Sequence, residues 1–245
     1  ATDAYNVAVG MFAGEAVTTG IFNSLHGALA GSSLTDADRN TAVGMNALGS
    51  DTLGSKSTAV GQSALFAQNF TTATDSNNTA VGYNAGVAVT TGTNNTLIGS
   101  LAGDALTAAF ENTAVGESAL GFDTLGRRTV AIGSGALQTQ NFTTATNSYN
   151  VAVGYDAGVL VTTGTHNILI GGLAGDAITD GNSNVAVGHT ALGQETRGDR
   201  SVAVGAFALQ AANSTTDADV YNTAVGYNAG GTLSTGSLNT LMGGL

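Results

Sequence analysis

The stretch NTAVGYNAG, residues Asn78–Gly86, is repeated letter for letter at Asn222–Gly230, and a near copy, NVAVGYDAG, lies midway at Asn150–Gly158. Related copies run along the whole chain, and each contains one glycine after a short apolar run: Gly10, Gly27, Gly44, Gly61, Gly82, Gly99, Gly116, Gly133, Gly154, Gly171, Gly188, Gly205, Gly226 and Gly243. Successive spacings are 17, 17, 17 and 21 residues, so four units make a super-repeat of 72 residues. A fixed period of this kind indicates a repeat architecture in which each unit packs only on its neighbours.

The repeat predicts a single domain over residues 1–245, because the spacing leaves no segment outside it. The super-repeats are expected at residues 6–77, 78–149 and 150–221, with a partial fourth at 222–245. The four extra residues fall in every fourth unit, in QNFTTATDSN (68–77), QNFTTATNSY (140–149) and the diverged QAANSTTDADVY (210–221).

Each unit opens with a period-two alternation that predicts a short strand. The residue before the motif glycine is Val, Ile or Met in 13 of 14 units, with His26 the exception, and the residue between the two β-branched positions is Ala or Leu. A 17-residue coil cannot bury its own valines, so we expect stacked coils to align them as a core row, each contributing about 1.5–3 kcal/mol. The predicted fold is an all-β parallel β-solenoid of about 14 coils.

An asparagine four residues before the motif glycine recurs in 11 of 14 units, and Ser57, Thr129 and Ser201 replace it in the others. Stacked asparagine side chains can form hydrogen bonds along a ladder, and asparagine tolerates turn geometry. We interpret this column as structural.

The composition disfavours several function classes. The 245 residues include no cysteine, which excludes disulfides. The net charge is −11 with only six Lys and Arg, which argues against nucleic acid as a partner. No apolar run reaches the roughly 20 residues of a membrane span, so no membrane insertion is expected in this segment. The three histidines lie in unrelated columns and no column carries paired carboxylates, so we expect no catalytic, metal or cofactor site and no enzymatic activity.

The pattern N/S-[TV]-A-[VI]-G-x-x-A resembles the YadA-like head repeats of trimeric autotransporter adhesins and related repeats in bacteriophage tail fibres. The resemblance covers every unit and implies a left-handed parallel β-roll, three chains packed side by side as a homotrimer, and no enzymatic activity. It also implies an extracellular location, on a bacterial cell surface or a virion.

Association is also expected from the small residues. Alanine at the middle strand position, and again three residues after the glycine, would allow sheets of different chains to approach closely. Where leucine replaces the middle alanine, at Leu25, Leu97, Leu169 and Leu241, it would either anchor the interface or fill a wider core layer.

Two sets of residues are candidates for surface binding. The inserted loops carry the aromatic residues Phe70, Phe142, Tyr149 and Tyr221, which could stack on sugar rings of a cell-surface glycan or contact a protein receptor, or else cap the solenoid corner. The corners just before them pair an acid with a base: Asp51 with Lys56, Asp123 with Arg128, and Glu195 with Arg200. These corners would form either exposed salt bridges or a basic stripe of Lys56, Arg128 and Arg200 that binds an anionic glycan.

Three functions follow as hypotheses. The first is a structural and adhesive segment of an extracellular fibre that contacts a host or cell surface. The second is an architectural filament or spacer without a specific ligand. The third is an ice-binding solenoid, suggested by the pairs Thr18–Thr19, Thr90–Thr91 and Thr162–Thr163, although these pairs recur only in every fourth coil.

Overall fold

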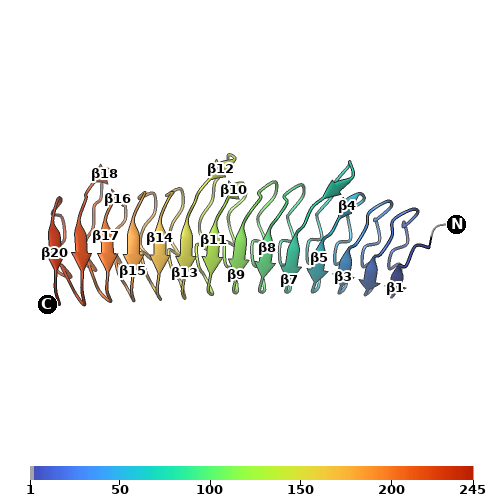
Figure 1. The fold of residues 1–245 in the computed structure, drawn as a ribbon, viewed down its shortest axis with the longest axis horizontal. Coiled ribbons are helices and arrows are strands. Elements are labelled where there is room, and N and C mark those ends of the chain that lie inside the picture. The colour runs from blue at the N-terminus through green and yellow to red at the C-terminus, as the bar shows by residue number, and fades with distance from the viewer. Residues whose placement is uncertain (1–2, 245) are drawn as a thin grey trace. The chain divides into compact units, whose positions relative to one another are not determined.

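The computed structural model describes residues 3–244, so Ala1, Thr2 and Leu245, the ends of the predicted repeat domain, lie outside the described residues. The chain is an all-β parallel β-solenoid of about 14 turns, with no helix in the part that is described (Figure 1). The chain divides into two compact units, Ala1–Ser118 and Ala119–Leu245. Each unit contributes seven three-residue strands, one per turn.

In the first unit the strands pair in parallel in the order of the sequence: β1 (Val7–Val9), β2 (Ser24–His26), β3 (Thr41–Val43), β5 (Thr58–Val60), β7 (Thr79–Val81), β8 (Thr96–Ile98) and β9 (Thr113–Val115). The register matches the sequence repeat, since Ala42 lies opposite Ala59 and Ala80 opposite Leu97. A small second sheet joins β4 (Gly54–Ser55) to β6 (Thr74–Asp75).

The second unit repeats this arrangement with β11 (Val130–Ile132), β13 (Val151–Val153), β14 (Ile168–Ile170), β15 (Val185–Val187), β17 (Val202–Val204), β19 (Thr223–Val225) and β20 (Thr240–Met242). It holds two small parallel sheets. One pairs β10 (Gly126–Arg127) with β12 (Thr146–Asn147), and the other pairs β16 (Gly198–Asp199) with β18 (Ala218–Asp219).

The interior column of the sheet is the middle residue of each strand, and the prediction that the valines form the core is wrong. Ala42 and Leu97 are fully buried, whereas Val43 is 38% exposed and Ile98 is 39% exposed. A strand of three residues can turn only its central side chain inward when its neighbours face out, and the narrow coil admits only one small or medium side chain there. Apart from Ala8, which is exposed in the first strand, the middle alanines therefore fill the inside of the coil and are not available for contact with another chain.

Of the four middle leucines, Leu25, Leu97 and Leu169 are buried and fill the core layer, whereas Leu241 in the last strand is half-buried. A Cβ atom placed on Gly86 or Gly103 would lie 2.6 or 2.7 Å from a Leu97 methyl group, so this leucine fills the space left by the glycines of two turns. In six of the ten turns whose middle residue is alanine, a leucine four residues after the motif glycine, such as Leu48 or Leu65, is buried instead, and the other four turns have glycine there. Over each cycle of four turns, the large interior side chain thus alternates between the middle strand position and the position four residues after the motif glycine.

The motif glycine is required by the close approach of successive turns. Gly27 has a φ of 140°, and a Cβ atom there would lie 2.5 Å from the carbonyl oxygen of Gly44 in the next turn. Gly44 meets the carbonyl oxygen of Gly61 at the same 2.5 Å. Both the backbone conformation and the distance exclude a side chain, which explains why this column does not vary.

The asparagine ladder is confirmed. The Asn78 Oδ1 atom accepts a hydrogen bond from the backbone N–H of Asn95 at 2.9 Å, and Asn78 Nδ2 donates to the carbonyl oxygen of Gly92 at 2.7 Å. The same pair of bonds recurs at Asn23, Asn40, Asn150, Asn167, Asn184 and Asn222. These side chains are buried and each holds two turns together, so the column is a structural element.

Candidate functional site

The longer loops of every fourth turn form three corners that we name by order in the chain. The first corner comprises residues 51–57 and the inserted loop 68–77, the second 123–129 and 140–149, and the third 195–201 and 212–221. The loops project beyond the neighbouring turns and carry the small sheets β4·β6, β10·β12 and β16·β18 (Figure 1). A threonine hydroxyl holds the backbone of each loop, since Thr52, Thr124 and Thr196 donate to a loop carbonyl oxygen at 2.8–2.9 Å.

The first corner is closed around a buried carboxylate. Asp51 Oδ1 accepts hydrogen bonds from the backbone N–H groups of Gly54 and Phe70 at 3.1 and 3.0 Å, and Oδ2 accepts from Gln68 Nε2 at 2.5 Å. Gln68 Nε2 also donates to Ser57 Oγ at 2.8 Å, and Gln68 Oε1 accepts from the ladder residue Asn78. The buried polar groups thus form one connected network that joins the loop to the ladder.

The second corner has the same arrangement. Asp123 Oδ1 accepts from the N–H groups of Gly126 and Phe142, both at 3.0 Å, and Oδ2 accepts from Gln140 at 2.6 Å. The Thr129 hydroxyl lies 2.6 Å from that of Ser148 and accepts from Gln140 at 3.2 Å. Burial raises the pKa of the Asp123 carboxyl above its ordinary value, although its hydrogen bonds act in the opposite direction.

The third corner keeps the backbone frame and changes the interior. Glu195 replaces the aspartate, and its Oε1 accepts from the N–H groups of Gly198 and Ser214 at 2.8 and 2.9 Å. Ala212 stands where the other corners have the buried glutamine, and Val220 stands where they have serine. The Ser201 hydroxyl has therefore lost both neighbours that its equivalents bind, and it is buried without a hydrogen-bond partner.

The structure separates the four aromatic candidates into two kinds. Phe70 and Phe142 are only 6% exposed, which places their rings inside the corner, where they cannot present a face to a sugar. Tyr149 and Tyr221 are 45% and 46% exposed at the loop ends. Of the four candidates, only the two tyrosines present a ring on the surface.

The basic candidates join the inserted loop to the preceding turn. Lys56 forms a salt bridge to Asp75 at 2.5 Å, the Arg128 guanidinium donates to the Tyr149 hydroxyl at 2.9 Å, and Arg200 pairs with Asp219. Arg200 also donates to the Tyr221 hydroxyl at 3.1 Å. The interpretation of the corner acids as members of exposed salt bridges is wrong, because Asp51, Asp123 and Glu195 are fully buried.

Each of the two arginines forms a surface pair with the tyrosine of its own corner. The Arg128 and Arg200 guanidinium carbons lie 5.8 and 5.6 Å from the ring centres of Tyr149 and Tyr221, within the range of cation–π contact. Two of the basic candidates are thus in contact with the two exposed aromatic candidates, although the sequence presented these residues as separate sets. The buried acids were missed as structural groups, although the spacing of Asp51 and Gln68, one coil apart and repeated at Asp123 and Gln140, could have indicated their contact.

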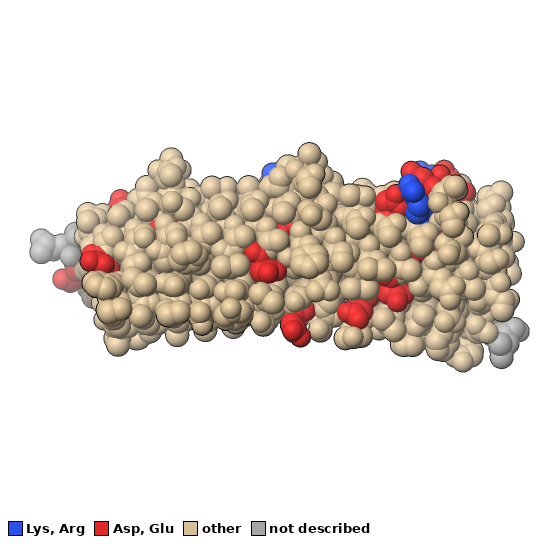
Figure 2. All heavy atoms as spheres, turned by 180° about the vertical axis from the view of Figure 1, so that it is seen from behind, with Lys and Arg blue, Asp and Glu red and all other residues tan. Residues whose placement is uncertain are grey.

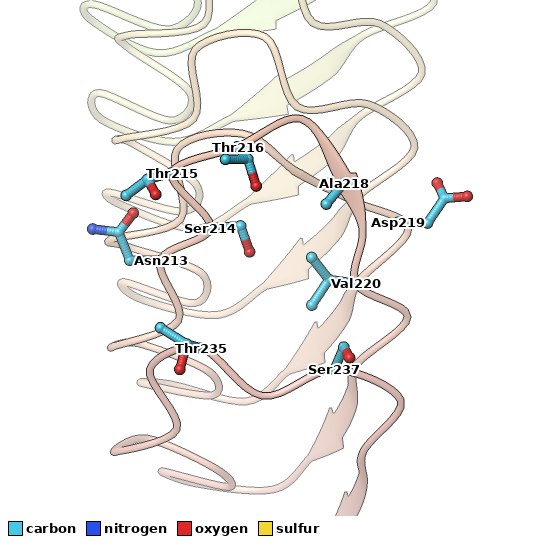
Figure 3. A pocket seen from close by; sticks show the side chains of 9 residues that line it. All are labelled: Asn213, Ser214, Thr215, Thr216, Ala218, Asp219, Val220, Thr235 and Ser237. Atoms are coloured by element: carbon cyan, nitrogen blue, oxygen red, sulfur yellow. The ribbon is translucent and has the colours of Figure 1, made fainter.

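The third corner also contains an open pocket of about 270 Å³ between its loop and the following turn. Ser214, Thr216, Ala218 and Val220 line it from the loop, and Thr235 and Ser237 line it from the next turn (Figure 3). The Asp219 side chain points away from the pocket in this view, which agrees with its pairing to Arg200.

A second candidate surface is the outer face of the main sheet in each unit. The two outward positions of the 14 strands are Thr, Ser, Val, Ile or Met, with His26 as the one titratable residue, and none is Asp, Glu, Lys or Arg. The wider surface is also poor in charge, since few side chains in the view of Figure 2 are acidic or basic. Exposed apolar residues gathered in this way commonly mark an interaction surface.

Comparisons with family models, with curated proteins and with solved structures find no match to this chain. Within residues 3–244, no helix has the length and apolar character needed to span a membrane.

Proposed function

We propose that this chain is a structural and adhesive segment of an extracellular fibre, on a bacterial surface or a phage virion, and that it has no enzymatic activity. In this proposal the copies associate side by side as a homotrimer, as the resemblance to YadA-like head repeats implies. The observation that carries the proposal is the uncharged, β-branched outer face of the sheet.

The distribution of charge supports association of like chains. The net charge of −11 would drive copies apart if the acids lay between them, but no outward strand position carries an acid. Val43, Ile98, Ile132, Ile168, Ile170 and Val225 are each between 36% and 40% exposed on this face. Burying such a surface against a second copy removes apolar area from water, which stabilises the assembly by about 25 cal/mol per Å² of buried apolar area.

The oligomeric state tests this part of the proposal. Sedimentation equilibrium should give a mass of three times 24.0 kDa. Val153→Arg and Ile170→Arg place charges at paired outward positions of β13 and β14, and the double variant should sediment as a monomer. Thr163→Arg, at an exposed position outside the strands, is the matched control and should leave the trimer intact. A monomeric unaltered chain would contradict the trimer.

Attachment tests the adhesive part and separates it from an architectural spacer. The exposed loop tyrosines make Tyr149→Ala and Tyr221→Ala the informative variants, since the buried phenylalanines would report on stability instead. An adhesive segment should lose most of its binding to cells or to a glycan array, whereas a spacer would show no loop-dependent binding. Tyr83→Ala, which removes an exposed tyrosine outside the inserted loops, is the matched control.

Ice binding remains as a second candidate because of an array that the sequence alone did not reveal. Thr41, Thr58, Thr79, Thr96 and Thr113 are in register on five consecutive strands of the first unit and face outward beside a Val or Ile. The threonine pairs considered earlier lie outside these strands and recur less often. A row of hydroxyl and methyl groups about 4.8 Å apart could order water. Thermal hysteresis that is lost in Thr79→Lys would favour this function, and its absence would exclude it.

A further inference from the structure

We propose that the pocket of the third corner binds one neutral sugar residue, and that the first two corners are closed forms of the same site. The three inserted loops are therefore not equivalent. Only the third would act as a saccharide site, in place of a ladder of identical sites.

The pocket lies where the sequence has exchanged a large side chain for a small one. Phe70 and Phe142 are buried in the first two corners, and the residue 72 positions further on is Ser214. A Cβ atom on Gly54 would lie 2.8 Å from the Phe70 ring, whereas one on the equivalent Gly198 would lie 2.8 Å from a Val220 methyl group. Val220 thus takes over the place nearest the glycine, and the rest of the phenyl volume is left open.

The backbone of the third corner does not collapse into this space. Glu195 holds the Ser214 N–H at 2.9 Å, and the Thr196 hydroxyl holds the Ser214 carbonyl oxygen at 2.8 Å. These bonds have equivalents at Phe142 in the second corner. The frame is therefore preformed, which lowers the ordering cost of binding a ligand.

The groups that line the pocket suit a sugar. Hydroxyls of Thr216, Thr235 and Ser237 can each donate and accept a hydrogen bond, as the hydroxyls of a saccharide require, and the Ser214 hydroxyl, which donates to Glu195 Oε2 at 3.4 Å, can accept one. Ala218 and Val220 provide an apolar wall for the C–H groups of the ring (Figure 3). Ligand sites combine apolar walls with a few convergent polar groups in this way.

Charge and size narrow the class of ligand. The charged residue that contributes to the lining is Asp219, and its carboxylate points outward and pairs with Arg200, so no charge faces the interior (Figure 3). A pocket without a facing charge favours a neutral ligand over an anionic or cationic one. At about 270 Å³ the pocket is slightly below the range of drug-sized sites, which fits a single ring with the rest of a chain outside.

This inference names the ligand class for the adhesive function proposed above and rests on that function only for its biological purpose. The test uses the unaltered chain labelled with ¹⁵N and titrated with glucose, galactose, mannose and N-acetylglucosamine as free sugars. Binding should be in the millimolar range, with amide shifts at residues 213–220 and 235–237. Residues 141–148, the closed equivalent in the same unit, provide the internal control and should not shift.

Closing the pocket gives the decisive variants. Ser214→Phe should weaken binding at least tenfold, and the double variant Ser214→Phe/Val220→Ser, which restores the residues of the second corner at both positions, should do the same with a native-like spectrum. Ser214→Ala keeps the pocket open and should retain most of the binding. Binding that persists when the pocket is closed, or no shift at 213–220 with any of these sugars, would overturn the inference.

The outcome for the site is separable from that for the fibre. If the unaltered chain and Ser214→Phe bind cells equally well and no free sugar shifts the amides at 213–220, adhesion stands and the sugar pocket is refuted. If free sugar binds at the third corner while no cell or glycan surface is bound, the pocket stands and the adhesive function fails.

Discussion

The second and third corners lie in one unit, share one backbone frame and differ in what fills it. In the second, Asp123, Gln140 and Ser148 form a polar network beside a buried phenylalanine. In the third, Glu195 accepts the equivalent backbone hydrogen bonds. Ser214, Ala212 and Val220 occupy the positions of Phe142, Gln140 and Ser148. The comparison indicates that the loop backbone is held by hydrogen bonds to the buried acid and not by the other buried side chains. A loop can therefore exchange those side chains and keep its backbone conformation.

The largest effect should come from removing the acid. Asp123→Ala leaves the N–H groups of Gly126 and Phe142 and the Gln140 amide without their acceptor, which should cost about 4 kcal/mol. Glu195→Ala should cost about 2 kcal/mol, because water can reach the Ser214 N–H through the open corner. Hydrogen exchange at the Phe142 and Ser214 amides measures both local openings. Equal losses of stability in the two variants would show that the third corner is no more open to water than the second.

Exchanging the residues at positions 142 and 214 should change the free energy of unfolding less, and by different amounts in the two corners. Phe142→Ser opens a cavity in a corner whose other residues are adapted to the ring, at a cost of about 3 kcal/mol. Ser214→Phe adds a ring to a corner that already has space, so its stability should change by about 1 kcal/mol or less in either direction. Chemical denaturation of the two variants, compared with Phe142→Leu as a volume control, gives the difference. A severe loss in Ser214→Phe would mean that Val220 has fully replaced the ring.

The sequence predicted the architecture of these corners better than their interior. The 17-residue period and the alternation were sufficient for a parallel solenoid, because only stacking can satisfy such a pattern, and the ladder of asparagines followed from their fixed column. The inward side of the strand was assigned wrongly. Valine is larger and more hydrophobic than alanine, so it was expected inside. A three-residue strand turns only its middle side chain inward, however, so Ala42 and Leu97 are buried and Val43 lies outside.

The contents of the corners could not be obtained from residue types alone. Asp51 and Lys56 are close in sequence and of opposite charge, which favoured an exposed pair, yet Asp51 is fully buried before strand β4 and Lys56 is exposed after it. The pocket of the third corner depends on a difference between aligned loops, Phe142 against Ser214, whose meaning is clear only when the ring is known to be buried. Its ligand class stays a prediction.

Removing a single hydroxyl should sharpen the comparison further. Thr129→Val keeps the shape of the side chain and removes its bonds to Ser148 and Gln140, which should cost about 1–2 kcal/mol. Ser201→Ala removes a buried hydroxyl without a partner, so the free energy of unfolding should be unchanged or rise by up to about 1 kcal/mol. Thermal unfolding of both variants suffices to rank them. A marked loss in Ser201→Ala would mean that an ordered water, or a bound ligand, satisfies this hydroxyl.

The smallest effect concerns pH at the second corner. Burial raises the pKa of Asp123, and the groups that face its carboxylate, the Gln140 amide and the N–H groups of Gly126, Phe142 and Thr124, carry no charge. An acid whose pKa is higher in the folded state binds more protons there, so its contribution to stability is fully present below the unfolded pKa and is lost as the pH rises through the folded pKa. Asp123→Asn cannot titrate, and the stability difference between the unaltered chain and this variant should therefore shift against the unaltered chain as the pH rises above 3.8, the ordinary pKa of an aspartate. Thermal unfolding of both proteins across this range measures the shift. A difference that is constant with pH, or one that shifts in favour of the unaltered chain, would show that the four hydrogen bonds to the carboxylate offset or outweigh its burial.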